Sequence, residues 1–108
     1  MEEVMSVEEA LEMCDHDKEF MEEMLVLMRE DVRLCLDLLA TAYREKDAVR
    51  ITEVSHRIKG QAASMAAKDL LQESSKLENA AKTGFYTRTE YLHLILSLKK
   101  FLRCTTNI

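Results

Sequence analysis

The amino-acid sequence predicts an all-α protein: an up-down antiparallel four-helix bundle with a short extra N-terminal helix. The 108 residues include no proline and only two glycines, which leaves little turn chemistry for a β-sheet. Hydrophobic residues make up 47% of the chain and recur at helical spacing. The stretches between periodic segments are short, so successive helices are expected to be antiparallel neighbours. This length suits one domain, and we expect residues 1–108 to form it.

Capping residues ahead of apolar positions indicate the first two helices. Ser6-Val7-Glu8-Glu9 has the spacing of a capping box and predicts a short helix that ends near Asp15. Asp15 or Asp17 then caps a long helix that continues to about Glu45. The spacing in this long helix predicts an inward-facing stripe of Phe20, Met24, Leu27, Leu34, Leu38 and Ala42, widened by Met28, Cys35 and Leu39.

The third helix is expected to begin after Asp47 and to end near Ala66, with a break at Ala67-Lys68. Its predicted core stripe consists of Ile51, Val54, Ile58, Ala62 and Met65.

Two further helices complete the predicted bundle. The fourth helix is expected to start at Asp69 and to end at Gly84, because a glycine commonly follows a helix C-terminus. Its predicted inward residues are Leu70, Ser74, Leu77 and Ala81. Thr87 or Thr89 is expected to cap the last helix. Its predicted inward residues are Tyr91, Leu94, Ile95, Leu98, Phe101 and Leu102.

The composition excludes several classes of function. A net charge of −5 argues against a nucleic-acid-binding face, and no apolar run approaches the roughly 18 residues of a membrane span. The acidic start, Met1-Glu2-Glu3-Val4, lacks the basic and apolar regions of a signal peptide. Cys14, Cys35 and Cys104 are widely separated and form no CxxC pair, so neither a zinc site nor a redox motif is expected. We expect a cytoplasmic protein, with access to the nucleus if its source is eukaryotic, that binds neither nucleic acid nor membranes.

His56 is the candidate functional residue because it lies on the outward face of the third helix. At about 100° per residue, its side chain lies about 160° from the centre of the core stripe. Lys59 follows one turn later, where its charge attracts anions to the same spot. An exposed imidazole beside a lysine is suited to act as a nucleophile that carries a phosphoryl group. The alternative is a solvated histidine on an ordinary polar face.

Gly60 argues against that alternative. A glycine inside a helix costs about 1 kcal/mol relative to alanine, and close approach of a partner is a reason to tolerate it. We therefore expect a docking surface around His56. Its predicted residues are Thr52, Glu53, Gly60, Ala63 and Ala67 of the third helix, with Met21 of the second helix as an exposed hydrophobic residue nearby.

The stretch His56-Arg57-Ile58-Lys59-Gly60, the small residues at 61–67, and the pairs Leu70-Leu71 and Leu77-Glu78 carry a resemblance. The chain resembles the histidine-containing phosphotransfer (Hpt) domain, most strongly between Asp17 and Gly84. Its H-x-x-K-G core is fairly specific when it lies on a helix of a bundle. The sequence departs from the family at Ala66, where a glycine is common.

The resemblance implies a phosphorelay intermediate in two-component signalling. His56 would accept a phosphoryl group from a receiver-domain aspartate and pass it to another, in either direction. Lys59 would stabilise the phosphoryl charge, Gly60 would clear space, and Glu78 or Lys82 would support the histidine from the next helix. Partners would be receiver domains of response regulators or hybrid histidine kinases. Mg²⁺ is expected on the receiver, so the chain would need no cofactor or metal of its own.

The chain is expected to be a phosphocarrier and not a self-sufficient kinase, because it has neither GxxxxGK[ST] nor GxGxxG. No second apolar face is predicted, so a monomer is expected.

The sequence leaves two alternative functions open. Glu53-Val54-Ser55-His56 and Glu90-Tyr91-Leu92-His93 have the Glu-x-x-His spacing of di-metal carboxylate bundles. That chemistry needs both pairs to face inward, whereas the helical phase places Glu53, His56 and His93 outward. The second alternative is a non-catalytic interaction bundle, such as an inactive phosphotransfer-like adaptor. Seven methionines suit an adaptable surface, although most are expected in the core.

Overall fold

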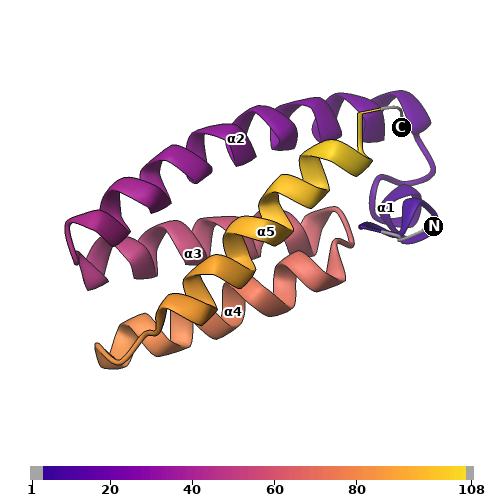
Figure 1. Ribbon diagram of the computed structural model, residues 1–108. Helices are drawn as coiled ribbons and strands as arrows, with labels where there is room; N and C mark the ends of the chain where they lie inside the picture. Colours follow the sequence, from indigo (N-terminus) through magenta and orange to yellow (C-terminus); the bar gives the residue numbers. More distant parts are fainter. Residues whose placement is uncertain (1–3, 107–108) are drawn as a thin grey trace.

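The computed structural model describes residues 4–106, and this part of the chain consists of helices joined by short connections (Figure 1). The helices are α1 (Val7–Met13), α2 (Lys18–Arg44), α3 (Ala48–Ser64), α4 (Lys68–Thr83) and α5 (Arg88–Cys104). The four long helices α2 to α5 form an antiparallel bundle, and α1 lies at the end near the termini (Figure 1). The all-α prediction is confirmed. Met1, Glu2 and Glu3, on which the expectation of no signal peptide partly rests, lie outside the described residues.

The predicted caps begin three of the helices. The side chains of Asp17 and Asp47 each accept a hydrogen bond at 3.0 Å from the backbone N–H three residues later. Thr87 and Glu90 form a complete capping box at the start of α5. Each of these contacts satisfies an amide that would otherwise lack a partner at a helix N-terminus.

The capping box predicted at Ser6 is only half formed. The Ser6 side chain accepts from the Glu9 amide, but its own N–H donates to the carbonyl of Ala66 at 3.0 Å. The Glu9 carboxylate lies 3.2 Å from Lys68 Nζ. Both contacts attach the N-terminal segment to the turn between α3 and α4.

Ala66, where the sequence departs from the family, lies in the turn between α3 and α4. This buried alanine has a φ of 53°, in the left-handed region that glycine adopts most easily. The helix α4 starts at Lys68 with Ala67 as its N-cap, which offers no side-chain hydrogen bond. Asp69, the predicted start, therefore lies within the first turn of α4. Gly84 ends the helix as predicted, with a φ of 80°.

The core residues predicted for α3 and α4 are all buried, and these two helices share the most extensive contact in the bundle. In α5, Leu94, Leu98 and Phe101 are buried, and the other three predicted inward residues are half-buried. None of the helices found in residues 4–106 is long and apolar enough to cross a membrane.

The predicted stripe of α2 is partly wrong. Phe20, Met24, Leu27 and Leu34 are exposed, whereas Met21, Leu25 and Val32 are buried with Met28, Cys35, Leu39 and Ala42. The helix carries two adjacent apolar stripes, and the bundle covers only one of them. The open stripe consists of Phe20, Met24, Leu27 and Leu34, and its Met24 and Leu27 line a groove beside α3. The prediction that Met21 is an exposed docking residue is therefore wrong, because Met21 is 1% exposed.

Candidate functional site

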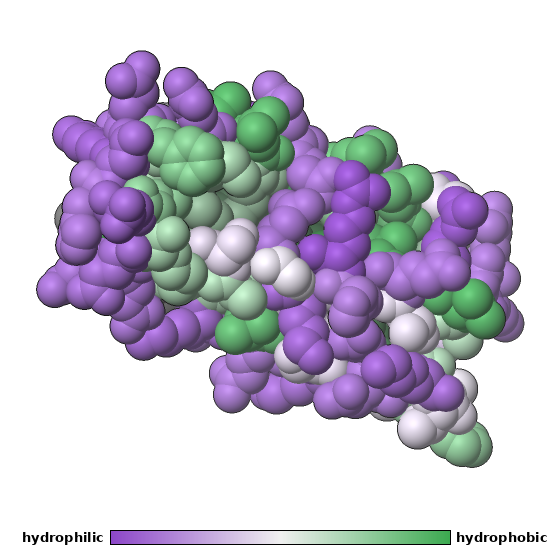
Figure 2. Space-filling view, turned by 180° about the vertical axis from the view of Figure 1, so that it is seen from behind, coloured by the Kyte–Doolittle hydropathy of each residue, from purple (hydrophilic) through white to green (hydrophobic). Residues whose placement is uncertain are grey.

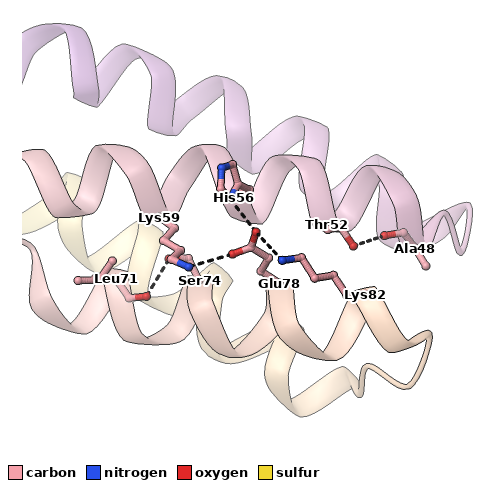
Figure 3. Close-up of polar contacts among 8 residues, drawn as sticks. All are labelled: Ala48, Thr52, His56, Lys59, Leu71, Ser74, Glu78 and Lys82. Atoms are coloured by element: carbon pink, nitrogen blue, oxygen red, sulfur yellow. Dashed lines mark hydrogen bonds and ion pairs between the residues drawn. The ribbon is translucent and has the colours of Figure 1, made fainter.

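His56 extends from the middle of α3 into solvent, with 72% of its side chain exposed. Its Nδ1 atom lies 2.7 Å from Oε2 of Glu78 on α4, and the other ring nitrogen points away from this carboxylate (Figure 3). The predicted outward orientation of His56 is confirmed. One side of the ring is held by the protein and the other is open to a partner.

Glu78 is the centre of the polar contacts beside His56 (Figure 3). Only 2% of its side chain is exposed. Its Oε1 lies 3.4 Å from Lys59 Nζ, and its Oε2 lies 3.6 Å from Lys82 Nζ. Both residues suggested as support from the next helix therefore lie in the cluster, with Glu78 in direct contact with the histidine.

The surroundings of Glu78 keep its carboxyl group ionised. Burial alone would raise the pKa of Glu78, but hydrogen bonds from His56 and Lys59, with the charges of Lys59 and Lys82, outweigh it and lower that pKa. An ionised carboxylate only accepts hydrogen bonds, so Nδ1 of His56 must be the donor. Neutral His56 then has its lone pair on Nε2, on the open side of the ring. This arrangement provides an oriented nitrogen nucleophile.

The surface beside His56 has few side chains. Gly60 is exposed, and a Cβ added to it would meet no heavy atom within 4 Å. Ala63 and Glu53 are also exposed. Thr52 is half-buried and its hydroxyl donates to the Ala48 carbonyl at 2.8 Å. These four predicted docking residues therefore lie on or beside the exposed face of α3.

Ala67 does not belong to this surface. It is fully buried, because α3 ends at Ser64 and the chain turns inward to cap α4. The prediction for Ala67 assumes that the helical spacing of α3 continues to residue 67, whereas the helix ends at Ser64. The docking role predicted for Ala67 is therefore wrong.

The open stripe of α2 supplies the apolar surface that was expected from Met21. Between this stripe and α3 lies a groove of about 290 Å³, one to three turns along α3 from His56. The residues that line the groove are Met24, Leu27, Met28, Asp31, Gln61, Ser64 and Met65. Figure 2 shows the side opposite to that of Figure 1, where apolar areas interrupt a largely hydrophilic surface, most broadly on the half near the termini.

Asp31 joins α2 to α3 at the edge of this groove, a contact that local sequence patterns do not predict. Its carboxylate accepts from Nε of Arg57 at 3.0 Å, and also from the Nη2 atom of Arg57 and the amide of Gln61. The thiol of Cys35 lies 3.5 Å from the same carboxylate. Burial and the negative charge of Asp31 raise the pKa of Cys35 to about 12. Arg57 and Gln61 are 26 and 30 residues from Asp31, so no local sequence signal connects them to it.

The di-metal alternative requires an arrangement that the structure does not have. Glu53 and His93 are exposed, and His93 lies 3.8 Å from Glu73 on the outside of the bundle. Among residues 4–106, no group of three or more His, Cys, Asp or Glu side chains is placed to hold a metal ion. The methionines are mostly in the core: Met5, Met21, Met28 and Met65 are buried, and Met13 and Met24 are exposed.

Known proteins share this architecture. A sequence model of the Hpt domain family matches residues 23–97, a segment that contains His56, Lys59, Gly60, Glu78 and Lys82. The Hpt domain of a sensor hybrid histidine kinase from Shewanella has a TM-score of 0.84 and 17% identity, over 94% of this chain and 89% of that one. Histidine-containing phosphotransfer protein B from Pseudomonas aeruginosa PAO1 has a TM-score of 0.84 and 17% identity, over 96% of this chain and 92% of that one. At this identity the two structures establish a shared fold. No curated protein sequence matches the chain.

Proposed function

The chain belongs to the histidine-containing phosphotransfer (Hpt) domain family, which relays phosphoryl groups in two-component signalling, and we propose that His56 carries the phosphoryl group here. One observation supports this assignment above all. His56 is 72% exposed on one side and hydrogen-bonded at 2.7 Å to a buried carboxylate on the other. Neither His16 nor His93, which are exposed, has a hydrogen bond of this kind among the described contacts.

The chemistry requires positioning more than covalent assistance. Nε2 of His56 attacks the phosphorus of an aspartyl phosphate in line with the departing carboxylate oxygen. Lys59 and Lys82 lie beside the histidine, where their positive charges stabilise the equatorial oxygens of the transferring group. The receiver provides the aspartate and the Mg²⁺ ion. The Hpt chain provides the oriented nucleophile and the charged surroundings.

The receiver docks on α3 and on the open stripe of α2. Gly60 and Ala63 let its backbone approach α3 closely, and the exposed Phe20, Met24 and Leu27 offer apolar surface next to the groove. The partners in this proposal are receiver domains of response regulators or hybrid histidine kinases. The chain acts as a monomer in the cytoplasm and needs no cofactor of its own.

Phosphoryl transfer from a phosphorylated receiver tests the assignment. The wild-type chain should acquire a label that is labile to acid and stable to alkali, as a phosphoramidate is. The variant His56→Gln should remain folded, because changes at exposed positions have little effect on stability. It should stay unlabelled, because glutamine has no imidazole nitrogen to accept the phosphoryl group. The matched control is His93→Gln, which changes an exposed histidine that also lies near a glutamate. Full labelling of His56→Gln would exclude His56 as the acceptor.

The same experiment separates the relay from the inactive adaptor. An adaptor would bind receivers through the same surface without acquiring a label. The oriented Nε2 atom favours the relay, since an adaptor has no need for a buried carboxylate against the histidine. Receiver binding without labelling of the wild-type chain would favour the adaptor.

A further inference from the structure

We propose that Glu78 keeps a proton on Nδ1 of His56 both when the phosphoryl group arrives and when it leaves, so that the leaving group of the second transfer is always neutral imidazole. The inference rests on the proposed role of His56 as the phosphoryl carrier. It makes Glu78 a positioning residue that sets the lifetime of the phosphohistidine, beyond orienting the ring for attack.

The contacts of Glu78 support this role. The Nδ1–Oε2 distance of 2.7 Å is typical of a charge-assisted hydrogen bond. The charged groups that contact Glu78 in the described part of the chain are His56 and Lys59 from α3 and Lys82 from its own helix. The lowered pKa of Glu78 agrees with a carboxylate that stays ionised at neutral pH. Because Glu78 is buried, this negative charge stays beside Nδ1 whatever happens on the open side of the ring.

The proton on Nδ1 decides which species leaves when the phosphoryl group moves on. In the first transfer, the Nε2 lone pair forms the N–P bond, the P–O bond to the donor aspartate breaks, and that carboxylate departs with the electron pair. The ring then carries a positive charge, with Nδ1–H still bonded to Glu78. In the second transfer, an aspartate or water oxygen attacks the phosphorus and the N–P electrons return to Nε2.

With the proton in place, the product of the second transfer is neutral imidazole. Without it, the product is imidazolate, which is a much poorer leaving group. The ionised carboxylate of Glu78 stabilises the ring that is protonated on Nδ1, and the neutral amide of a glutamine at this position would stabilise it less. The proton therefore makes the phosphohistidine reactive, and Glu78 favours rapid transfer over storage.

The substitution Glu78→Gln tests this inference, because it retains a hydrogen-bonding side chain and removes the charge. Wild-type and variant chains are phosphorylated with potassium phosphoramidate, a small-molecule donor, and the loss of phosphate from His56 is followed between about pH 6 and pH 10. The rate of phosphate loss should fall as pH rises. The pH at which it has fallen by half should be about one pH unit lower in the variant than in the wild type. Above both of these pH values, the phosphohistidine should survive about ten times longer.

The matched control is Glu73→Gln, on the same helix. Glu73 lies near His93 and Lys76 and does not contact His56, so this variant should lose phosphate at the wild-type rate. Superimposable pH profiles for wild type and Glu78→Gln would overturn the inference. A wild-type chain that is not labelled at His56 would instead contradict the proposed function itself.

A second measurement needs no variant and covers the case in which Glu78→Gln fails to fold. The wild-type profile is compared with that of phosphohistidine as the free amino acid, phosphorylated on the same ring nitrogen. The folded protein should keep its fast rate to a pH about one unit higher. Coincident profiles would overturn the inference.

Discussion

Replacing Gly60 with alanine should make the protein more stable and a poorer phosphoryl acceptor. The added Cβ would have no heavy atom within 4 Å, so the methyl group meets no steric resistance within the chain. Alanine is about 1 kcal/mol better than glycine in a helix interior. For a domain of this size, that gain raises the Tm by about 4 °C. Thermal unfolding followed by circular dichroism measures the change.

The same methyl group lies on the surface where, in the proposed relay, the receiver approaches. We therefore expect slower transfer from a phosphorylated receiver to Gly60→Ala, and much slower transfer to Gly60→Gln. A displacement of about 1 Å of the reacting groups can cost about 100-fold in rate, which sets the scale for glutamine. Single-turnover transfer kinetics at several receiver concentrations measure the rates.

The other glycine of the chain is a matched control. Gly84 has a φ of 80° at the end of α4, where a side chain costs about 1–2 kcal/mol. Gly84→Ala should therefore lower the Tm and leave transfer unchanged, which is the reverse of the expected result for Gly60→Ala. A Gly60→Ala variant that is more stable and transfers at the wild-type rate would refute the docking explanation for Gly60. A less stable one would refute the open-space argument.

Three further predictions concern stability and reactivity. Ala66→Gly should raise the free energy of unfolding in urea by about 1 kcal/mol, because it relieves the left-handed conformation at φ 53°; a decrease would contradict the strain argument. Because folding lowers the pKa of Glu78, its charge stabilises the protein above the usual glutamate range, and this stability is lost as pH falls through the lowered pKa. The difference in unfolding free energy between wild type and Glu78→Gln should therefore shrink below about pH 5, and a difference that grows there would be inconsistent with it. The pKa of Cys35 is raised to about 12, so at pH 8 this buried thiol should react with Ellman's reagent only when the protein unfolds, later than the partly exposed Cys104. Equal reaction rates for Cys35 and Cys104 in the folded protein would refute the protection of Cys35.

Local features of the sequence predicted much of this fold correctly. Asp17, Asp47 and Thr87 begin helices, and Gly84 ends one, because capping depends on residues within one turn of each other. The orientation of His56 was also predictable, since α3 has a single apolar stripe that defines its inward direction. The roles assigned to Lys59, Gly60 and the other site residues stay predictions until transfer is measured.

Features that depend on how two helices meet could not be predicted from local spacing. The hydrogen bond from His56 to Glu78 joins residues 22 positions apart, and the sequence suggested Glu78 only through the family resemblance. The contact between Asp31 and Arg57 spans 26 positions and was not anticipated at all. Both contacts depend on the rotation of α3 against its neighbours, which is decided by packing across the whole bundle.

The error in α2 has a physical cause that bears on function. The spacing of Phe20, Met24 and Leu27 is that of a buried helix face and predicts a place in the core. Periodicity identifies apolar side chains that are buried against something, and it does not distinguish this chain from a partner. In this bundle the core takes Met21, Leu25 and the rest of the adjacent stripe, so the first set remains at the surface beside α3. Apolar residues at regular helical spacing that the fold leaves open suit contact with another protein, and in the proposed relay that protein is the receiver.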